Sequence, residues 1–77
     1  MRIPRDITGE HLIHILGRAG YHKIRQTGSH VRLEHSGASR HVISVPMESP
    51  IKVGTLESIL KEVSRFLGVS IDDIIKD

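Results

Sequence analysis

The sequence predicts a two-layer α+β domain, in which a helix, three antiparallel strands, a second helix and a short last helix follow one another along the chain. Two segments carry apolar residues at helical spacing, near residues 9–19 and 56–67, and the segments between them are short and alternate between apolar and polar residues. Both helices can bury their apolar stripes against the apolar face of the sheet. We therefore expect one domain over residues 1–77, with both helices on one sheet face and the other face open to solvent.

Capping residues indicate where the helices begin and end. Thr8 is placed to cap the first helix and Gly20 to end it. The second helix ends at Gly68, and Ser70 with Asp73 three residues later forms a capping box for the short last helix. The apolar stripes consist of Leu12, Ile15, Leu16 and Ala19 in the first helix, and of Leu56, Ile59, Leu60, Val63 and Leu67 in the second.

Three strands are expected, at residues 21–26, 29–35 and 39–46. Val31 and Ile43 belong to the apolar faces of the second and third strands, so the numbers of paired residues must sum to an even value. A three-residue loop over residues 36–38 satisfies this rule. The resulting pairs are His35 with Ser39, Leu33 with His41, Val31 with Ile43 and His30 with Ser44. This register places His30 on the polar, basic face that is turned away from the core.

Composition narrows the class of protein. The chain has 77 residues, no cysteine and a formal net charge of +2, which excludes a disulfide-supported core and a thiolate site. It has no apolar run long enough to span a bilayer and no apolar secretory core near residue 1, so we expect a cytoplasmic protein without a membrane partner. Between Arg18 and Arg40, five basic residues stand against the single acid Glu34. This basic middle suits a polyanionic partner, and an ordinary solvated surface is the alternative.

The six histidines are each candidates for chemistry. His11 and His14 are three residues apart on the first helix and could share a metal ion, but no cysteine is present and no third ligand is indicated, so no metal site is expected. His41 is expected to point inward beside Leu33 as a hydrogen-bonded core residue. Surface positions are expected for His22 and His35.

His30 is the strongest candidate for a catalytic residue. It follows Gly28 and Ser29, whose backbone amides can approach a phosphate because glycine has no Cβ. It shares the exposed face with Arg32, and basic residues of the neighbouring strand lie near it. An imidazole exchanges protons near neutral pH, and RNA cleavage requires a base for the 2′-hydroxyl, an acid for the leaving oxygen and cations for the charge on phosphorus. The alternative is a plain strand histidine on a basic face.

Three stretches of the chain resemble one known family. They are Thr8-Gly9-Glu10-His11-Leu12 with Ala19-Gly20-Tyr21; Arg25-Gln26-Thr27-Gly28-Ser29-His30-Val31; and Val45-Pro46 followed by Lys52-Val53-Gly54-Thr55-Leu56 and Ile59-Leu60. In these stretches, between residues 7 and 67, the sequence resembles the HicA toxins of bacterial and archaeal type II toxin–antitoxin systems. The resemblance implies an α-β-β-β-α fold like that of double-stranded-RNA-binding domains, which agrees with the order of elements expected above.

The resemblance also implies an activity and a partner. HicA toxins are mRNA-cleaving ribonucleases, which implies that His30 is catalytic and that neither a metal nor another cofactor takes part. An HicB-type antitoxin would bind the toxin and mask His30, and we expect the toxin alone to be a monomer. Family members often carry a second histidine shortly after the Val-Pro pair, where this chain has Met47-Glu48-Ser49. We expect RNA-binding roles for Gly28, Ser29, Arg32, Arg25, Lys23, Arg40 and Lys52.

In the expected mechanism, His30 deprotonates a 2′-hydroxyl, which attacks the adjacent phosphorus and leaves a cyclic phosphate. Arg32, with Arg25 or Lys52, holds the phosphate and offsets its growing charge. The sequence indicates no second acid, so water or His30 itself must protonate the leaving group. Two other functions remain open. One is an RNA-binding module without chemistry, since double-stranded RNA is read through phosphates and 2′-hydroxyls; the other is an interaction domain whose basic face docks an acidic antitoxin.

Overall fold

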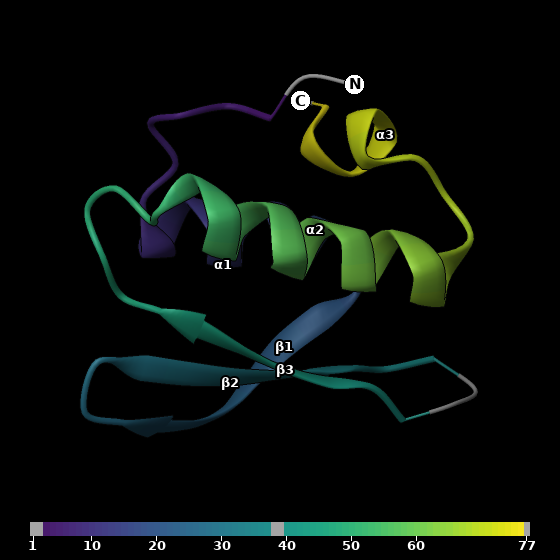
Figure 1. Cartoon of the computed structure of the whole chain (residues 1–77). Helices are drawn as coiled ribbons and strands as arrows, with labels where there is room; N and C mark the ends of the chain where they lie inside the picture. The colour runs from purple at the N-terminus through teal and green to yellow at the C-terminus, as the bar shows by residue number, and fades with distance from the viewer. Residues whose placement is uncertain (1–2, 38–39, 77) are drawn as a thin grey trace.

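Three antiparallel strands form one layer of the molecule, and two helices pack side by side across one face of it (Figure 1). The computed structural model describes residues 3–37 and 40–76. Its elements are α1 (Gly9–Arg18), β1 (Tyr21–Thr27), β2 (His30–His35), β3 (Val42–Pro46), α2 (Val53–Leu67) and α3 (Ile71–Ile75), with the strands in the order β1-β2-β3. The predicted α+β class, the order of the elements and the placement of both helices on one face are confirmed.

The helix ends lie where the capping residues predict them. The Thr8 hydroxyl accepts a hydrogen bond from the His11 amide, and Gly20 follows α1 with a φ of +104°. Gly68 ends α2 in the left-handed conformation, with a φ of +71°. The Ser70 hydroxyl caps α3 by accepting from the Asp73 amide at 3.1 Å. Within the described ranges, no helix combines the length and the apolar character that crossing a membrane requires.

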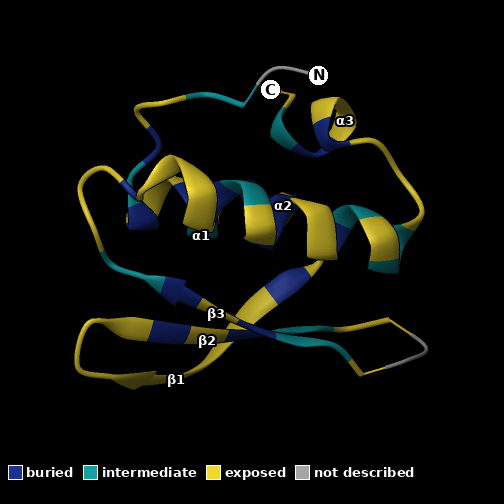
Figure 2. Ribbon diagram, viewed as in Figure 1, coloured by how far each residue is buried: buried dark blue, intermediate teal, exposed yellow. Residues whose placement is uncertain are grey.

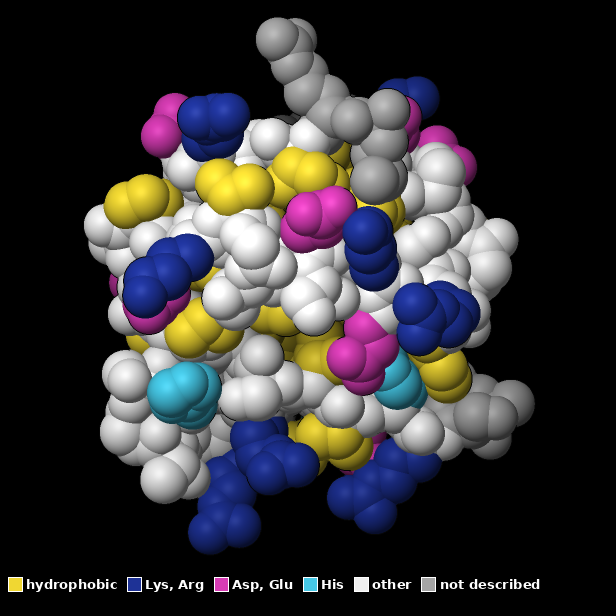
Figure 3. All heavy atoms as spheres, in the orientation of Figure 1, with side chains coloured by type: hydrophobic (Ala, Val, Ile, Leu, Met, Phe, Trp, Pro, Cys, Tyr) yellow, Lys and Arg dark blue, Asp and Glu magenta, His cyan; other side chains and the backbone are white. Residues whose placement is uncertain are grey.

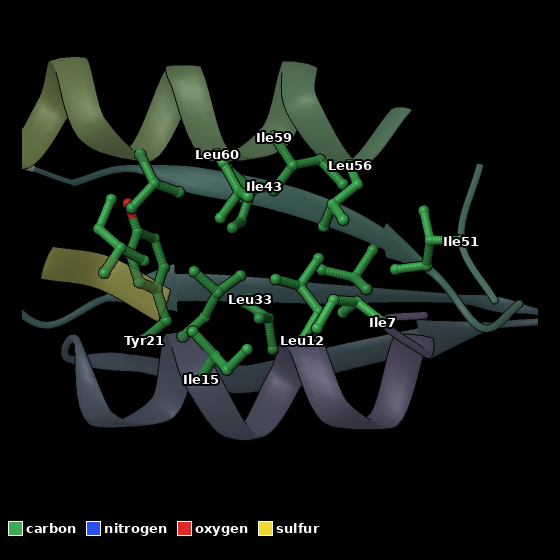
Figure 4. Packing of buried hydrophobic residues seen from close by; sticks show 14 of the residues in the cluster. Ile7, Leu12, Ile15, Tyr21, Leu33, Ile43, Ile51, Leu56, Ile59 and Leu60 are labelled. Atoms are coloured by element: carbon green, nitrogen blue, oxygen red, sulfur yellow. The ribbon is translucent and has the colours of Figure 1, made fainter. Parts of the chain in front are cut away.

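The core lies between the sheet and the two helices. Leu12 from α1 and Leu60 from α2 converge there with Leu33 and Ile43 from the sheet (Figure 4). α3 lies over the helices on the side away from the sheet, where it buries Ile71 and Ile74. Nothing in the described part of the chain covers the opposite sheet face, and β1 is exposed after Tyr21 (Figure 2). The apolar side of this small domain is therefore separate from its solvent-facing side.

The register of β2 and β3 preserves the predicted faces but shifts the predicted pairs by two residues. Leu33 lies opposite Ile43, Val31 opposite Val45 and His30 opposite Pro46. The even-sum rule is confirmed, whereas the three-residue loop is wrong because β3 begins at Val42 and the His35 amide donates to the His41 carbonyl. The predicted partner of His35, Ser39, lies outside the described residues.

His41 determines this longer connection. The Tyr21 hydroxyl donates to Nδ1 of His41 at 2.6 Å, and the Nε2–H of His41 donates to Glu62 at 2.9 Å. The imidazole also stacks on Phe66 with ring centroids 4.3 Å apart. Burial, and then the charge of Glu62, raise the pKa of Tyr21 to about 12, so its hydroxyl stays a donor. The predicted inward, hydrogen-bonded role of His41 is confirmed, but its position beside Leu33 is wrong because these three partners hold it further along the sheet.

The surface position predicted for His35 is also wrong. His35 is half-buried, its Nε2–H donates to the Ala19 carbonyl, and its Nδ1 accepts from the Gly37 amide. Its ring packs edge-on against Tyr21. Because both ring nitrogens are engaged, His35 connects the end of α1 to the β2–β3 connection. His22 is exposed, as predicted, and is hydrogen-bonded to Ser36.

Candidate nucleic-acid interface

The candidate site lies on the sheet face that no helix covers, which we call the open face. On β2 this face carries His30, Arg32 and Glu34, while the alternate residues Val31 and Leu33 are buried. Lys and Arg side chains protrude along the border of the molecule on which the sheet lies (Figure 3). Polar and cationic groups on an uncovered sheet face are suited to contact a polyanion.

His30 is the first residue of β2 and is exposed to solvent. Its ring makes no hydrogen bond, ion pair or ring contact with any residue in the ranges 3–37 and 40–76. The other histidine of β2, His35, has both ring nitrogens engaged. The ring of His30 is therefore accessible to a ligand on the open face.

A two-residue turn determines where His30 lies. Thr27 and His30 are paired across β1 and β2, and only Gly28 and Ser29 connect them. Gly28 has a φ of +58° and Ser29 does not have a positive φ, which is typical of a type II′ hairpin turn with glycine at its first central position. A Cβ at Gly28 would meet no atom within 4 Å, so the conformation of the turn, rather than crowding, explains this glycine.

The predicted cations divide into two groups. Arg25 of β1 lies opposite Arg32 of β2, and both are exposed on the open face beside His30. The remaining three lie elsewhere. Lys23 faces the other side of β1, Arg40 forms an ion pair with Glu34 at the end of the sheet remote from the turn, and Lys52 precedes α2. The structure thus brings two of the five cations together with His30.

Two hydroxyl side chains near His30 were missed by the sequence reasoning. Thr27 lies directly opposite His30, and Ser44 of β3 lies opposite Arg32. The signal for Thr27 was present, because a Gly-Ser pair between two strands makes the residues on either side of it partners. Ser44 is on the open face in both registers, but the predicted register pairs it with His30 whereas the structure pairs it with Arg32. Both hydroxyls are placed to contact a ribose or phosphate bound at the open face.

The comparison with known families decides which proteins this chain is related to. The model of the family described as the HicA toxin of bacterial toxin–antitoxin systems matches residues 9–64. The chain belongs to the HicA toxin family. The matched range runs from the start of α1 into α2 and contains the open-face residues described above, whereas α3 lies beyond it. No significant match was found among curated proteins or among solved structures.

Membership of the HicA family implies an antitoxin partner, because a HicA toxin is one component of a two-component system. In this HicA chain, no three histidine, aspartate or glutamate side chains within residues 3–37 and 40–76 are placed to hold a metal ion. His11 and His14 are both exposed on α1, and neither forms a hydrogen bond through its ring to another described residue.

The segment after β3 connects the His30 turn to the start of α1. The Met47 amide donates to the Ser29 carbonyl at 2.6 Å, and the Gly9 amide donates to the Glu48 carbonyl at 2.9 Å. A pocket of about 260 Å³ is located here, lined by Thr8, Gly9, Glu10, Met47, Glu48 and Ser49. The segment Met47-Glu48-Ser49, which in this HicA toxin stands where similar sequences often carry a second histidine, thus lies next to the Gly28-Ser29 turn.

We expect Gly28→Ala to lower the free energy of unfolding of this HicA toxin by about 1 kcal/mol, because a Cβ disfavours a positive φ. Gly28→Asn is expected to cost less, since asparagine tolerates this conformation better than other residues with a side chain. Urea unfolding of the two variants checks this difference. Equal losses for alanine and asparagine would show that the turn conformation is not the reason for the glycine.

Proposed function

We propose that this HicA toxin is an endoribonuclease that cleaves mRNA without a metal ion and thereby inhibits translation, with His30 as the general base. The observation that carries the proposal is an exposed imidazole on the open face that has no partner among the described residues, with Arg25 and Arg32 beside it. A neutral imidazole can accept a proton at cellular pH, and the arginines can offset negative charge on a phosphate.

The reaction starts when Nδ1 or Nε2 of His30 removes the proton of a ribose 2′-hydroxyl. The 2′-oxygen then bonds to the adjacent phosphorus, and the bond from phosphorus to the 5′-oxygen of the next nucleotide breaks. This leaves a 2′,3′-cyclic phosphate and a 5′-hydroxyl, whose proton comes from water or from protonated His30. Arg32, together with Arg25 or Lys52, holds the phosphate and stabilises its growing charge.

The same surface is suited to the antitoxin. We propose that an HicB-type antitoxin covers the open face and prevents RNA from reaching His30. The exposed cations on this face support an antitoxin surface that carries carboxylates, because electrostatic complementarity steers association. Glu34 is already paired with Arg40 within the chain, so the carboxylates of the antitoxin would meet Arg25 and Arg32.

The chemistry is tested by incubating the purified protein with RNA in excess EDTA. Cleavage is expected to persist, to produce 2′,3′-cyclic phosphate ends, and to stop at a position whose ribose is replaced by 2′-deoxyribose, because that position lacks the attacking oxygen. A strand containing one ribonucleotide among deoxynucleotides is the matched control and should be cut only there. Loss of cleavage with EDTA, or cleavage at the deoxy position, would overturn the proposed chemistry.

A further inference from the structure

The side of β1 on which Arg25 lies is not the side that strand alternation predicts. Tyr21 points into the core, so in a regular strand residues 23, 25 and 27 would share its face. The pairing of β1 with β2 is irregular between Lys23 and Arg25, because Lys23 lies opposite Leu33 and Arg25 lies opposite Arg32. Ile24 is therefore the extra residue of a β-bulge. After the bulge the faces are exchanged, and Arg25 is on the open face.

A side-chain contact supports this exchange independently. The Lys23 ammonium donates to the Gln26 side-chain oxygen at 3.0 Å. Residues three apart in a regular strand point to opposite faces and cannot meet in this way. With Ile24 as the extra residue, Lys23 and Gln26 both lie on the face opposite to Arg25. Two neighbouring cations of one strand thus have opposite orientations.

The position of Arg25 is unfavourable within the isolated protein. Side chains directly opposite each other on one sheet face have Cβ atoms about 5 Å apart, and like charges in such pairs destabilise a sheet. Arg25 and Arg32 form such a pair, and neither has a carboxylate partner among residues 3–37 and 40–76. The nearest acid on the open face of β2 is Glu34, which is paired with Arg40. A bound anion between the two guanidinium groups would remove this repulsion.

We propose that Arg25 and Arg32 grip one phosphate of the RNA between them and that the bulge at Ile24 positions Arg25 for this contact. Arg25, rather than Lys52 or Lys23, is then the second cation of the site. Each guanidinium donates to a different non-bridging oxygen, which is the geometry that arginine favours with phosphate. His30 lies diagonally across from Arg25 and two residues before Arg32 on the same face, so the gripped phosphate is next to the imidazole. This inference rests on the proposed ribonuclease function.

The experiment compares cleavage of a labelled mixed-sequence RNA by full-length variants whose substitutions are all at exposed positions. Arg25→Gln is expected to lower the rate about 100-fold, the typical cost of losing one donor to a developing charge. Lys23→Gln removes a charge from the same strand but from the other face, and should lower the rate far less. Arg65→Gln, on α2, is the control for loss of charge alone and should cleave like the wild type.

Two double variants keep the net charge and move the cation. The double variant Arg25→Gln, Gln26→Arg places the guanidinium on the face away from His30, and its cleavage rate should remain about 100-fold below that of the wild type. The double variant Arg25→Gln, Ser44→Arg places a guanidinium opposite Arg32 again, now from β3. Its cleavage rate should be about tenfold higher than that of Arg25→Gln alone. The affinities of the variants for an uncleavable 2′-O-methyl RNA should rank in the same order as their cleavage rates. In variants that lose the grip, the slope of log affinity against log salt concentration should be smaller in magnitude by about 0.7.

The outcomes separate the inference from the function on which it rests. If His30→Ala cleaves like the wild type, the proposed function fails. If His30→Ala is inactive but Arg25→Gln and Lys23→Gln are equally affected, the function stands and the grip is wrong. The grip would also be wrong if Gln26→Arg restored the cleavage rate of Arg25→Gln as fully as Ser44→Arg does, because the sheet face that carries the cation would then have no effect on the rate.

Discussion

His30→Ala is expected to lower the rate of RNA cleavage about 1000-fold, since a positioned general base contributes roughly 10²–10⁴ in rate. The expectation follows from the surroundings of the side chain. His30 is exposed and makes no contact through its ring with the described part of the chain, so its removal takes away a proton acceptor and leaves the packing intact. The free energy of unfolding should therefore change little, because substitutions at such surface positions are usually within about 0.5 kcal/mol of neutral.

The matched control is His22→Ala. His22 is the exposed histidine on the same sheet face, opposite Glu34, at the end remote from the turn, and its only described hydrogen bond is to Ser36. It should cleave RNA close to the wild-type rate. Parallel rate and urea-unfolding measurements on the two variants check both statements. The assignment of His30 would be wrong if the two variants lost activity equally, or if His30→Ala lost activity only because it unfolded.

Gly9→Ala is expected to lower the free energy of unfolding by about 2–3 kcal/mol, in the range of overpacked sites. A Cβ at Gly9 would lie 2.5 Å from the Pro46 carbonyl oxygen and 2.8 Å from the Met47 Cα. Both are backbone atoms, so the start of α1 must separate from the end of β3 to admit a methyl group. In a domain of this size, such a loss is a large fraction of the total stability.

The control for Gly9→Ala is in the same helix. A Cβ at Gly17 would meet nothing within 4 Å, and the position is exposed. Gly17→Ala should therefore stabilise the protein by about 0.5–1 kcal/mol, because alanine has the higher helix propensity. Urea midpoints of the two variants should move in opposite directions. A shift of both in the same direction would show that the approach of α1 to β3 is looser than its geometry indicates.

The helices could be predicted from the sequence because their signals are local. The Thr8 hydroxyl and the Gly68 conformation act on residues within one turn, and the structure places both as expected. The β2–β3 connection could not be predicted in the same way. A shift of two residues leaves every side chain on its face, so alternation cannot distinguish the two registers. The register depends on His41 reaching Tyr21 and Glu62, which are distant in sequence.

The candidate site was predictable to a similar extent. His30 and Arg32 alternate with the buried residues Val31 and Leu33, so their face could be read from β2 itself. The sheet faces on which Arg25 and Lys23 lie could not be predicted from the sequence. After Tyr21, β1 has no buried residue whose apolar character would indicate which side chains face the core. A bulge in an uncovered strand leaves no hydrophobic signal in the sequence. The choice between these two cations therefore required the structure.

The uncovered sheet face has a consequence for how a toxin of this kind can change over time. Its candidate working residues are solvent-exposed, whereas the residues that hold the layers together are on the other side of the same strands. Loss of the proposed ribonuclease activity and loss of the fold are then separate events. A variant that loses only His30 would keep the shape that the antitoxin recognises. Such a variant would act as a decoy, drawing antitoxin away from active copies in the same cell.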